Sequence, residues 1–423
     1  MARLKLKYGK ESVPCDLSGA SVLAPRLPDT GGRPEQLIDE ALDRPIASQR
    51  LEEIVRPGDK VAVVVSDITR YTGSEYYLPQ LAARLKRAGV AETDIQVVIG
   101  LGIHRRQTPQ EHRRILGPLH GRVEAIDHDC DDPAELAFLG TTASGMPIEI
   151  NRRVVEADRV VVSGTIGFHY FAGFGGGRKA LVPGVASRQT CMATHFAVFN
   201  SAKIGGKHAR ATTGVLEGNP VHEAILEGAR MVGPDFLFNT VLAPDKTIIG
   251  AFAGDLEQAH LAGCDLVRRL YRVELEHPAD LAIVSCGGHP KDINFVQAHK
   301  SLDYAVNAVR PGGTVILLAA CPDGYGHPDF HKWLRYQDLS AFEEALRENY
   351  QINGQTAHAT LSKARRYRVI LISGFDAEQT RAMGMEKAEG LDEALEMARA
   401  GLPSRHRAVI IPDGGTVLPS VRG

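Results

Sequence analysis

The chain has 423 residues, of which 43% are hydrophobic and 24% are charged, and its formal net charge is −2. A chain of this length exceeds one ordinary core and predicts two domains. The apolar content, with 43 glycines and 23 prolines, is typical of a folded, loop-rich α/β protein and excludes extensive disorder. The balanced charge creates no overall field for a polyanion, so we expect a small-molecule partner, no nucleic acid and no membrane.

The cysteines and apolar runs bear on the cellular compartment. The six cysteines are scattered without a CxxC spacing, which argues against a disulfide framework and a structural zinc site. The basic start of the chain is followed by no apolar signal-peptide core, and no run of about 18 apolar residues occurs. We therefore expect a cytoplasmic protein with reduced thiols.

Strands and helices alternate in the first part of the chain. Residues 60–67 predict a buried strand, 75–89 a helix and 94–102 a second buried strand, which together make a βαβ unit. Thr108 and Glu111, with a proline between them, predict a helix start. Further strands are expected within 147–165 and 236–255, and an amphipathic helix within 255–275.

A second α/β region follows a polar turn near residue 277. It begins with a strand at 279–288, a helix that runs through 305–309, a Pro-Gly-Gly turn and a strand at 314–320. The remaining expected elements are helices near 339–348, 376–386 and 391–400 and strands within 367–373 and 408–415.

The alternation predicts two α/β domains with an active-site cleft between them. The first domain, residues 1–275, would bind a cofactor and would be joined by the C-terminal segment 403–423. The second domain would comprise residues 276–402.

Polar side chains follow three strands of the first domain. Asp67, Thr69 and Arg70 follow the first strand, His104 follows the second and His169 follows a third. Because ligands of open α/β sheets bind at the carboxyl ends of strands, we expect these side chains to gather around one ligand. The alternative is that Asp67 and Thr69 cap the next helix and that the histidines bond to turn backbone groups.

A glycine-rich loop lies in the same domain. Gly175, Gly176 and Gly177 are followed directly by Arg178 and Lys179. A backbone that can approach a ligand closely, next to two cations, suits a phosphate group. The alternative is a flexible surface loop, because short glycine motifs are common.

Three further residues are candidate ligand contacts. His195 lies near the end of an expected helix, and a neutral imidazole is a common metal ligand, although one histidine cannot make a metal site by itself. Gln297 and Lys300 lie three residues apart on an expected helix and share a face that could hold a carboxylate. The alternatives are a structural histidine and a solvated helix charge.

These pieces, in this order, resemble the nickel-pincer-dependent lactate racemase family of 2-hydroxy acid racemases and epimerases. The matching motifs are SDITR at 66–70, GIHR at 102–105, GFHYFAGFGGGRKALVPG at 167–184, His195 and QAHK at 297–300. The resemblance spans most of the chain and implies an isomerase with two α/β domains. It also implies a nickel-pincer nucleotide, a pyridinium-3,5-bisthiocarboxylic acid mononucleotide with nickel, which cofactor-biosynthesis proteins would supply.

The resemblance assigns roles around this cofactor. Lys179 matches the lysine that attaches the cofactor covalently, and His195 matches the nickel ligand, with the cofactor bringing the other three donors. Gly175–Gly177 would hold the nucleotide phosphate. Asp67 and Thr69 would lie near the ribose or the pyridinium ring.

The resemblance also assigns the proton transfers. His104 and His169 match the acid and base of the family. One ring takes the hydroxyl proton while the α-hydrogen leaves reversibly as hydride to the cofactor, and the other ring returns a proton on the opposite face of the transient 2-oxo acid. Arg70 and Lys300, with a hydrogen bond from Gln297, would anchor the substrate carboxylate.

The sequence leaves the substrate open between lactate, malate and a related small hydroxy acid. Val296 stands where we expect an aromatic residue in lactate-specific relatives. Arg105 and Arg106 follow His104, and at least one of them could reach the second carboxylate of malate. The alternative is that both are solvated charges at the helix entry.

Two other function classes are weighed against the racemase. A nicotinamide-dependent 2-hydroxy acid dehydrogenase would carry GxGxxG after the first strand, and this fingerprint is missing. A non-catalytic protein that binds a nucleotide or a hydroxy acid fits the glycine loop and Lys179 but leaves the two convergent histidines unexplained.

Overall fold

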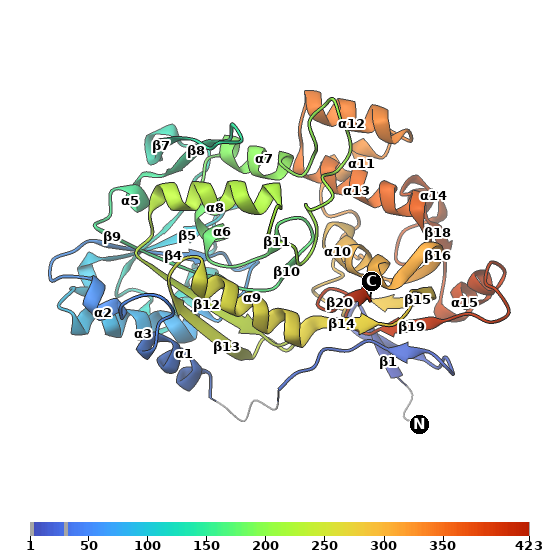
Figure 1. The fold of residues 1–423 in the computed structure, drawn as a ribbon, viewed down its shortest axis with the longest axis horizontal. Helices are drawn as coiled ribbons and strands as arrows, with labels where there is room; N and C mark the ends of the chain where they lie inside the picture. The colour runs from blue at the N-terminus through green and yellow to red at the C-terminus, as the bar shows by residue number, and fades with distance from the viewer. Residues whose placement is uncertain (1–3, 29–32, 423) are drawn as a thin grey trace. The chain divides into compact units, whose positions relative to one another are not determined.

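The computed structural model describes residues 4–28 and 33–422 and confirms the α/β class (Figure 1). The chain divides into two compact units. The first, here called the central unit, contains the described residues among 27–203 and 207–269. The second, here called the terminal unit, contains those among 1–26, 204–206 and 270–423.

The central unit is built on a six-stranded sheet in the order β13-β12-β9-β4-β5-β6. Neighbouring strands are parallel, except that β13 pairs antiparallel with β12. The strands are β4 (Val61–Ser66), β5 (Ile95–Gly100), β6 (Glu124–Asp127), β9 (Arg159–Thr165), β12 (Phe236–Leu242) and β13 (Ile248–Gly254).

The two strands predicted from continuous apolar runs are confirmed as β4 and β5. The sequence of β4, VAVVVS, is buried over its first five residues, as a parallel strand covered on both faces requires. The register places Val61 opposite both Ile95 of β5 and Arg159 of β9, so β4 lies in the middle of the sheet.

Helices and a short hairpin complete the central unit. The predicted helix start at Thr108 is confirmed, because its hydroxyl accepts from Glu111 N at 3.2 Å while the Glu111 carboxylate accepts from Thr108 N at 2.7 Å. The helices are α1 (Pro34–Asp43), α2 (Leu51–Ile54), α3 (Ser74–Arg87), α4 (Pro109–Leu116), α5 (Arg152–Val155), α6 (Arg178–Leu181), α7 (Arg188–Phe196), α8 (Pro220–Val232) and α9 (Gln258–Tyr271), and the hairpin is β7 (Leu136–Thr141) with β8 (Pro147–Asn151).

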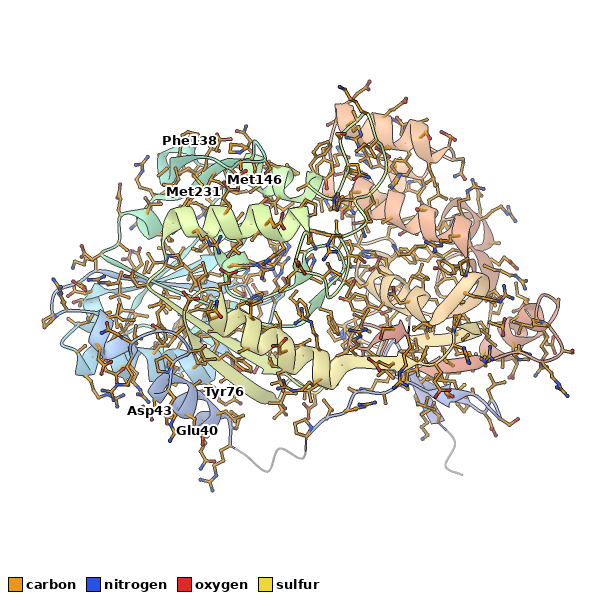
Figure 2. All side chains as sticks on the ribbon, viewed as in Figure 1. Glu40, Asp43, Tyr76, Phe138, Met146 and Met231 are labelled. Atoms are coloured by element: carbon orange, nitrogen blue, oxygen red, sulfur yellow. The ribbon has the colours of Figure 1, made fainter. Side chains whose placement is uncertain are left out.

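A buried arginine ties three of these helices together. Arg84 of α3 is 5% exposed and donates to Asp43 and, at 3.0 Å, to Asp39, both on α1. It also lies 3.3 Å from Glu52 of α2. Figure 2 shows Asp43 at the end of α1. The buried guanidinium is thus surrounded by carboxylates, the usual arrangement for a buried charge.

The terminal unit contains a second six-stranded sheet, in the order β18-β17-β16-β15-β19-β3, and all its neighbouring strands are parallel. Its strands are β3 (Ser21–Val22), β15 (Ala279–Ser285), β16 (Val309–Leu318), β17 (Arg368–Ile372), β18 (Glu386–Ala388) and β19 (Ala408–Ile411). Two more pairs are β1 (Leu4–Tyr8) with β2 (Glu11–Cys15) and β14 (Arg272–Leu275) with β20 (Leu418–Val421).

The predicted domain composition needs a correction at both ends of the chain. The described residues of the segment 403–423 do not join the first domain, because β19 pairs with β15 and because β14, the partner of β20, itself belongs to the terminal unit, which begins again at residue 270 and not at 276. The described residues among 1–26 also belong to the terminal unit, where β3 pairs with β19. The apolar strand β19, with the sequence AVII, lies between β15 and β3 and pairs with both. Local sequence patterns do not specify such long-range pairing.

Several helix boundaries in the terminal unit also differ from the prediction. The helix expected through 305–309 ends at Ala305, and the expected Pro-Gly-Gly turn is a bulge inside β16, where the register jumps from Val309 to Thr314. The helix expected near 376–386 ends at Ala382. The helices are α10 (Phe295–Ala305), α11 (Pro328–Trp333), α12 (Leu339–Glu348), α13 (Ile352–Arg366), α14 (Ala377–Ala382) and α15 (Leu391–Arg399), of which α11 and α13 were not predicted.

Within residues 4–28 and 33–422, no helix has both the length and the apolar character needed to cross a membrane.

Candidate active site

The predicted strand-end residues lie at the switch point of the central sheet. From β4 the chain continues to β5 and β6 on one side, whereas β9 and β12 occupy the other side. Asp67 follows β4, His104 follows β5, and the short strand β10 (Phe168–His169) follows β9. Ligands of open α/β sheets bind in the crevice at such a point.

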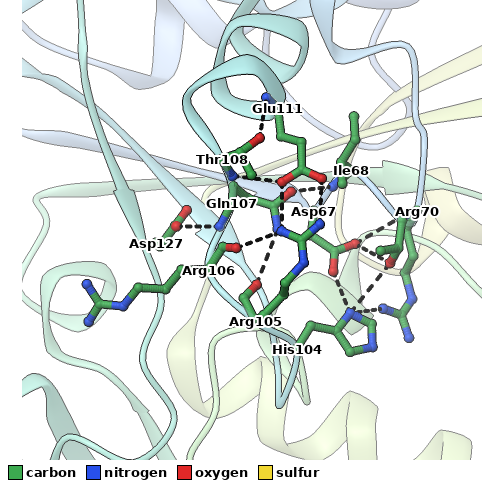
Figure 3. Close-up of polar contacts among 11 residues, drawn as sticks. Asp67, Ile68, Arg70, His104, Arg105, Arg106, Gln107, Thr108, Glu111 and Asp127 are labelled. Carbon is green, nitrogen blue, oxygen red and sulfur yellow. Dashed lines mark hydrogen bonds and ion pairs between the residues drawn. The ribbon is translucent and has the colours of Figure 1, made fainter. Parts of the chain in front are cut away.

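Asp67 and His104 form a carboxylate–imidazole pair. His104 Nδ1 lies 2.5 Å from Asp67 Oδ2 (Figure 3). The Asp67 side chain is fully buried, whereas that of His104 is 38% exposed. Burial raises the pKa of Asp67, but the hydrogen bond from His104 and the charge of Arg70 outweigh burial and hold this pKa below its usual value. The carboxylate therefore accepts the Nδ1 proton, and whenever the ring of His104 is neutral its lone pair lies on Nε2.

The capping alternative for Asp67 and Thr69 is wrong. The N-cap of α3 is Gly73, which makes no side-chain cap bond. Instead, Asp67 Oδ1 accepts from Thr69 Oγ1 at 2.7 Å and from Arg70 N at 3.2 Å, which fixes the turn after β4. This turn places Arg70 Nη1 3.5 Å from His104 Nδ1. A contact of Asp67 and Thr69 with a cofactor stays a prediction.

The buried ring of Phe171 brings three other predicted site residues together. His169 packs edge-on against this ring with centroids 4.5 Å apart, and His195 of α7 does so at 5.3 Å. Lys179 Nζ of α6 lies 5.7 Å from the Phe171 centroid, a cation–π distance. Sequence reasoning missed Phe171, although its position inside the motif GFHYFAGF, two residues after His169, was a usable signal.

Electrostatics sets the protonation of Lys179 and His195. Burial, followed by the charges of Arg178 and Arg70, lowers the pKa of Lys179 to about 7. Burial also lowers the pKa of His195 to about 4, assisted by Lys179 and Arg70 and opposed by a hydrogen bond to Cys191. At neutral pH a large fraction of Lys179 is therefore a neutral amine, and His195 is neutral.

One ring nitrogen of His195, the predicted metal ligand, is occupied by a hydrogen bond to the backbone. Its Nδ1 donates to the carbonyl oxygen of Cys191 at 2.8 Å, which leaves the lone pair on Nε2. Second hydrogen bonds of this kind commonly orient metal-binding histidines. Across the described parts of the chain, no group of three or more His, Cys, Asp and Glu side chains could hold a metal ion. A metal at His195 would therefore depend on donors from a bound group.

The glycine loop is packed into the protein and is not a flexible surface loop. Gly175 N donates to a backbone carbonyl at 2.9 Å, and Gly177 N donates to Asn239 Oδ1 at 2.8 Å. Gly176 has a φ of +110°, and a Cβ there would lie 2.8 Å from His260 Cδ2. Close packing thus requires glycine at position 176, while a role of the loop in phosphate binding stays a prediction.

Arg105 and Arg106 both have carboxylate partners in the chain. Arg105 donates to the two oxygens of Glu111 at 2.8 and 2.7 Å (Figure 3), and Arg106 donates to Asp129 at 3.0 Å. Their side chains are 64% and 73% exposed. These pairs agree with solvated charges at the entry of α4, and contact with a second substrate carboxylate stays a prediction.

Gln297 and Lys300 lie on α10 of the terminal unit. The predicted shared face is confirmed, because Lys300 Nζ donates to Gln297 Oε1 at 2.8 Å. Asn294 caps the helix by accepting from Gln297 N at 3.0 Å. Their part in carboxylate binding stays a prediction.

Sequence comparisons identify relatives of the whole chain. The lactate racemase N-terminal domain matches residues 8–206, and the lactate racemase C-terminal domain matches residues 275–418. A lactate racemase from Thermoanaerobacterium thermosaccharolyticum is 31% identical over 430 residues and 99% of each chain. A lactate racemase from Lactiplantibacillus plantarum is 35% identical over 395 residues, which cover 91% of this chain and 90% of the relative.

Structural comparison gives the same family. The structure of the lactate racemase apoprotein from Thermoanaerobacterium thermosaccharolyticum is similar over 100% of both chains, with a TM-score of 0.90 and 31% identity. A crystal structure of a protein from Thermotoga maritima shares the fold, with a TM-score of 0.67, 20% identity and coverage of 92% of this chain and 98% of that chain.

The family models and the relatives together indicate an isomerase of the racemase class. The chain belongs to the lactate racemase family, as the resemblance of its motifs predicted.

Proposed function

We propose that this protein is a racemase of 2-hydroxy acids, with lactate, malate or a related small hydroxy acid as substrate. It would use a nickel-pincer nucleotide attached at Lys179. Its relatives support the reaction class. The observation that carries the proposal is the gathering, in one unit, of an exposed base oriented by a buried carboxylate with a neutral amine and a neutral imidazole.

The residues of the central unit fit the proposed cofactor. Lys179 offers an amine that is readily deprotonated, and His195 offers a neutral Nε2 lone pair. One imidazole suffices for a nickel ion when the other donors come with the bound group. When bound, the group supplies acceptance and return of the α-hydrogen as hydride. Proteins that make the cofactor would be partners of the chain.

His104 is the base best prepared to begin turnover. Its Nδ1 proton is held by Asp67, so Nε2 is the atom that would accept the hydroxyl proton. Once the ring becomes cationic, the fully buried carboxylate of Asp67 stabilises it through a charge-assisted hydrogen bond.

His169 is prepared differently. The backbone N–H of Ala172 donates to His169 Nδ1 at 3.3 Å, so the neutral ring carries its proton on Nε2. In this form Nε2 donates a hydrogen bond to a substrate oxygen. To return a proton, His169 must act as the cation, which requires the contact with Ala172 N–H to be given up.

Arg70 is positioned to hold the substrate carboxylate near these rings. Its guanidinium lies beside His104, and an arginine fork binds a carboxylate through two hydrogen bonds. We propose that Lys300 and Gln297 add further contacts with the carboxylate. Fixing the carboxylate would let only the reacting carbon change orientation.

The proposal is tested with protein purified from cells that make the cofactor. Nickel content and intact mass report loading, and chiral chromatography follows single enantiomers of lactate and malate. We expect a mass increase on Lys179, bound nickel and conversion of at least one substrate to a mixture of enantiomers. Nickel-loaded protein that leaves every enantiomer unchanged would support a binding protein, and conversion to the 2-oxo acid only with added nicotinamide would support a dehydrogenase.

A further inference from the structure

Arg178, next to Lys179, is a buried cation held by neutral groups. It is 0% exposed, and its Nε donates to His222 Nδ1 at 3.1 Å. Its Nη1 lies 2.8 Å from His260 Nε2, and its Nη2 donates to the carbonyl oxygen of Phe174 at 3.2 Å. Throughout the described residues, none of the hydrogen-bond partners of Arg178 is a carboxylate.

The contrast with Arg84 shows that this arrangement is unusual within the chain. Arg84 is also buried, but its guanidinium faces Asp39, Asp43 and Glu52. A buried charge without a counterion costs free energy. The fold therefore retains at Arg178 a positive charge that it neutralises at Arg84.

The two histidines beside Arg178 are held neutral. Burial and then the charge of Arg178 lower the pKa of His222 to about 3, and Arg230 acts in the same direction. Burial and Arg178 hold the pKa of His260 well below its usual value, against the opposing hydrogen bond from its Nε2 to the carbonyl oxygen of Gly175, and His222 and Arg268 add to the lowering. The neutral ring of His222 accepts from the guanidinium, and neither neutral histidine compensates its charge.

The positive charge of Arg178 acts directly on the neighbouring Lys179. After burial, the largest influence that lowers its pKa is Arg178, followed by Arg70, while Cys191 acts weakly in the opposite direction. His195 also faces Lys179, as a neutral ring. A cation fixed on the preceding residue disfavours a second cation at Lys179 Nζ.

The same guanidinium holds the loop that carries the site aromatics. Besides the Phe174 carbonyl, it reaches the carbonyl oxygens of Ala172 at 3.5 Å and Gly175 at 3.4 Å. Ala172 follows Phe171 and donates to His169 Nδ1. Arg178 is thus in contact with the backbone that positions both His169 and Phe171.

We infer that Arg178 is a positioning residue with two separable effects, one on Lys179 and one on the loop 172–175. Its uncompensated charge keeps Nζ of Lys179 as an unprotonated, reactive amine, and its fork fixes the loop 172–175. The inference rests on the proposed function, in which Lys179 is the attachment point of the cofactor, but it concerns the chain before any cofactor is bound.

The charge effect is tested by competitive acetylation of the apo chain with acetic anhydride between pH 6 and pH 10. Mass spectrometry measures Lys179 relative to the exposed Lys10. His222→Glu places a carboxylate against Arg178, whereas His222→Gln offers a neutral acceptor of similar size. We expect Lys179 labelling at pH 7 to fall about twofold in His222→Glu, which corresponds to a rise of about half a unit from a pKa of about 7, and to be unchanged in His222→Gln.

The fork effect is tested with Arg178→Lys, which keeps the charge and loses the planar donors. We expect near-normal Lys179 labelling but faster hydrogen exchange over residues 168–177. His260→Glu and His260→Gln form a second matched pair for the charge effect if His222→Glu does not fold, as judged by thermal unfolding.

Equal Lys179 labelling in the Glu and Gln variants of a folded pair would overturn the charge effect, and unchanged exchange in Arg178→Lys would overturn the fork effect. Failure of the proposed function is a separate result, because the loaded enzyme would then leave hydroxy acids unchanged whatever the labelling of the apo chain shows.

Discussion

His104 and His169 are expected to share the proton transfers, yet the protein supports them in opposite ways. His104 is held by a buried carboxylate that stabilises the cationic ring. His169 is held by a backbone N–H that favours the neutral ring with its proton on Nε2. Two residues of one type, assigned one joint role by sequence, thus have different hydrogen-bond partners, so we expect them to enter the proposed reaction in different tautomers. His104 is prepared to take a proton, and His169 must first gain one.

The strongest test of this comparison removes each ring. We expect His104→Ala and His169→Ala each to lower the racemisation rate by about 1,000-fold, within the range for a lost proton-transfer group, while nickel content is retained. His195→Ala should instead lose nickel. Measurement of nickel and of initial rates from each enantiomer separates these outcomes, and wild-type rates in either of the first two variants would refute the two-histidine scheme.

The next largest effect is expected from the carboxylate that only His104 possesses. Asp67→Asn keeps the size of the side chain but removes the charge that stabilises the cationic ring, so the rate should fall by about 100-fold. Thr69→Val, which keeps the carboxylate and loses the 2.7 Å contact with Asp67 and a 3.5 Å contact with His104 Nδ1, is the matched control with a smaller loss. If Asp67→Asn turns over at the wild-type rate, the support of His104 by Asp67 is not functional.

The same carboxylate should make the apo chain sensitive to acid. Because the pKa of Asp67 is lower in the folded chain than in the unfolded chain, its stabilising effect is present above about pH 4 and is lost as the pH falls through the folded pKa. The stability difference between wild type and Asp67→Asn, measured by urea unfolding, should therefore be larger at pH 6 than at pH 3.5, and its total loss below the folded pKa should be about 1.4 kcal/mol per unit of pKa shift. Asp129→Asn, a partly exposed control, should show less change.

The smallest effect concerns the arginines that follow His104. Arg105→Ala and Arg106→Ala should raise the KM for malate several-fold and leave that for lactate unchanged if either guanidinium leaves its surface partner for a second carboxylate. Each ion pair is exposed, so the loss of stability should stay below about 1 kcal/mol. Unchanged KM values in both variants would indicate that the two arginines pair only with Glu111 and Asp129 and do not bind the substrate.

The sequence was sufficient where local pattern decides structure. The runs that became β4 and β5 and the cap at Thr108 are short-range signals, and the strand-end rule placed Asp67 beside His104. The sequence was insufficient where segments that are distant in the chain pair with each other. The pairing of β19 with β15 and the bulge inside β16 depend on partners that no local window contains.

The same limit applies within the site. The glycines at 175–177 suggested a ligand loop, but Asn239 and His260, more than 60 residues away, account for much of their packing. Arg178 was seen only as half of a basic pair, because its burial and its neutral partners follow from the tertiary fold. Phe171 carries no polar chemistry, and a search for reactive side chains passes over it.

Phe171 has a consequence for anyone who wishes to redesign this site. One apolar ring is in contact with a candidate proton carrier, an amine and a candidate metal ligand. A substitution of Phe171 therefore cannot change the position of one of these three groups without changing the positions of the others. A smaller or larger side chain at position 171 would move all of them together, so the site should tolerate change at its rim far better than at this single non-reactive residue.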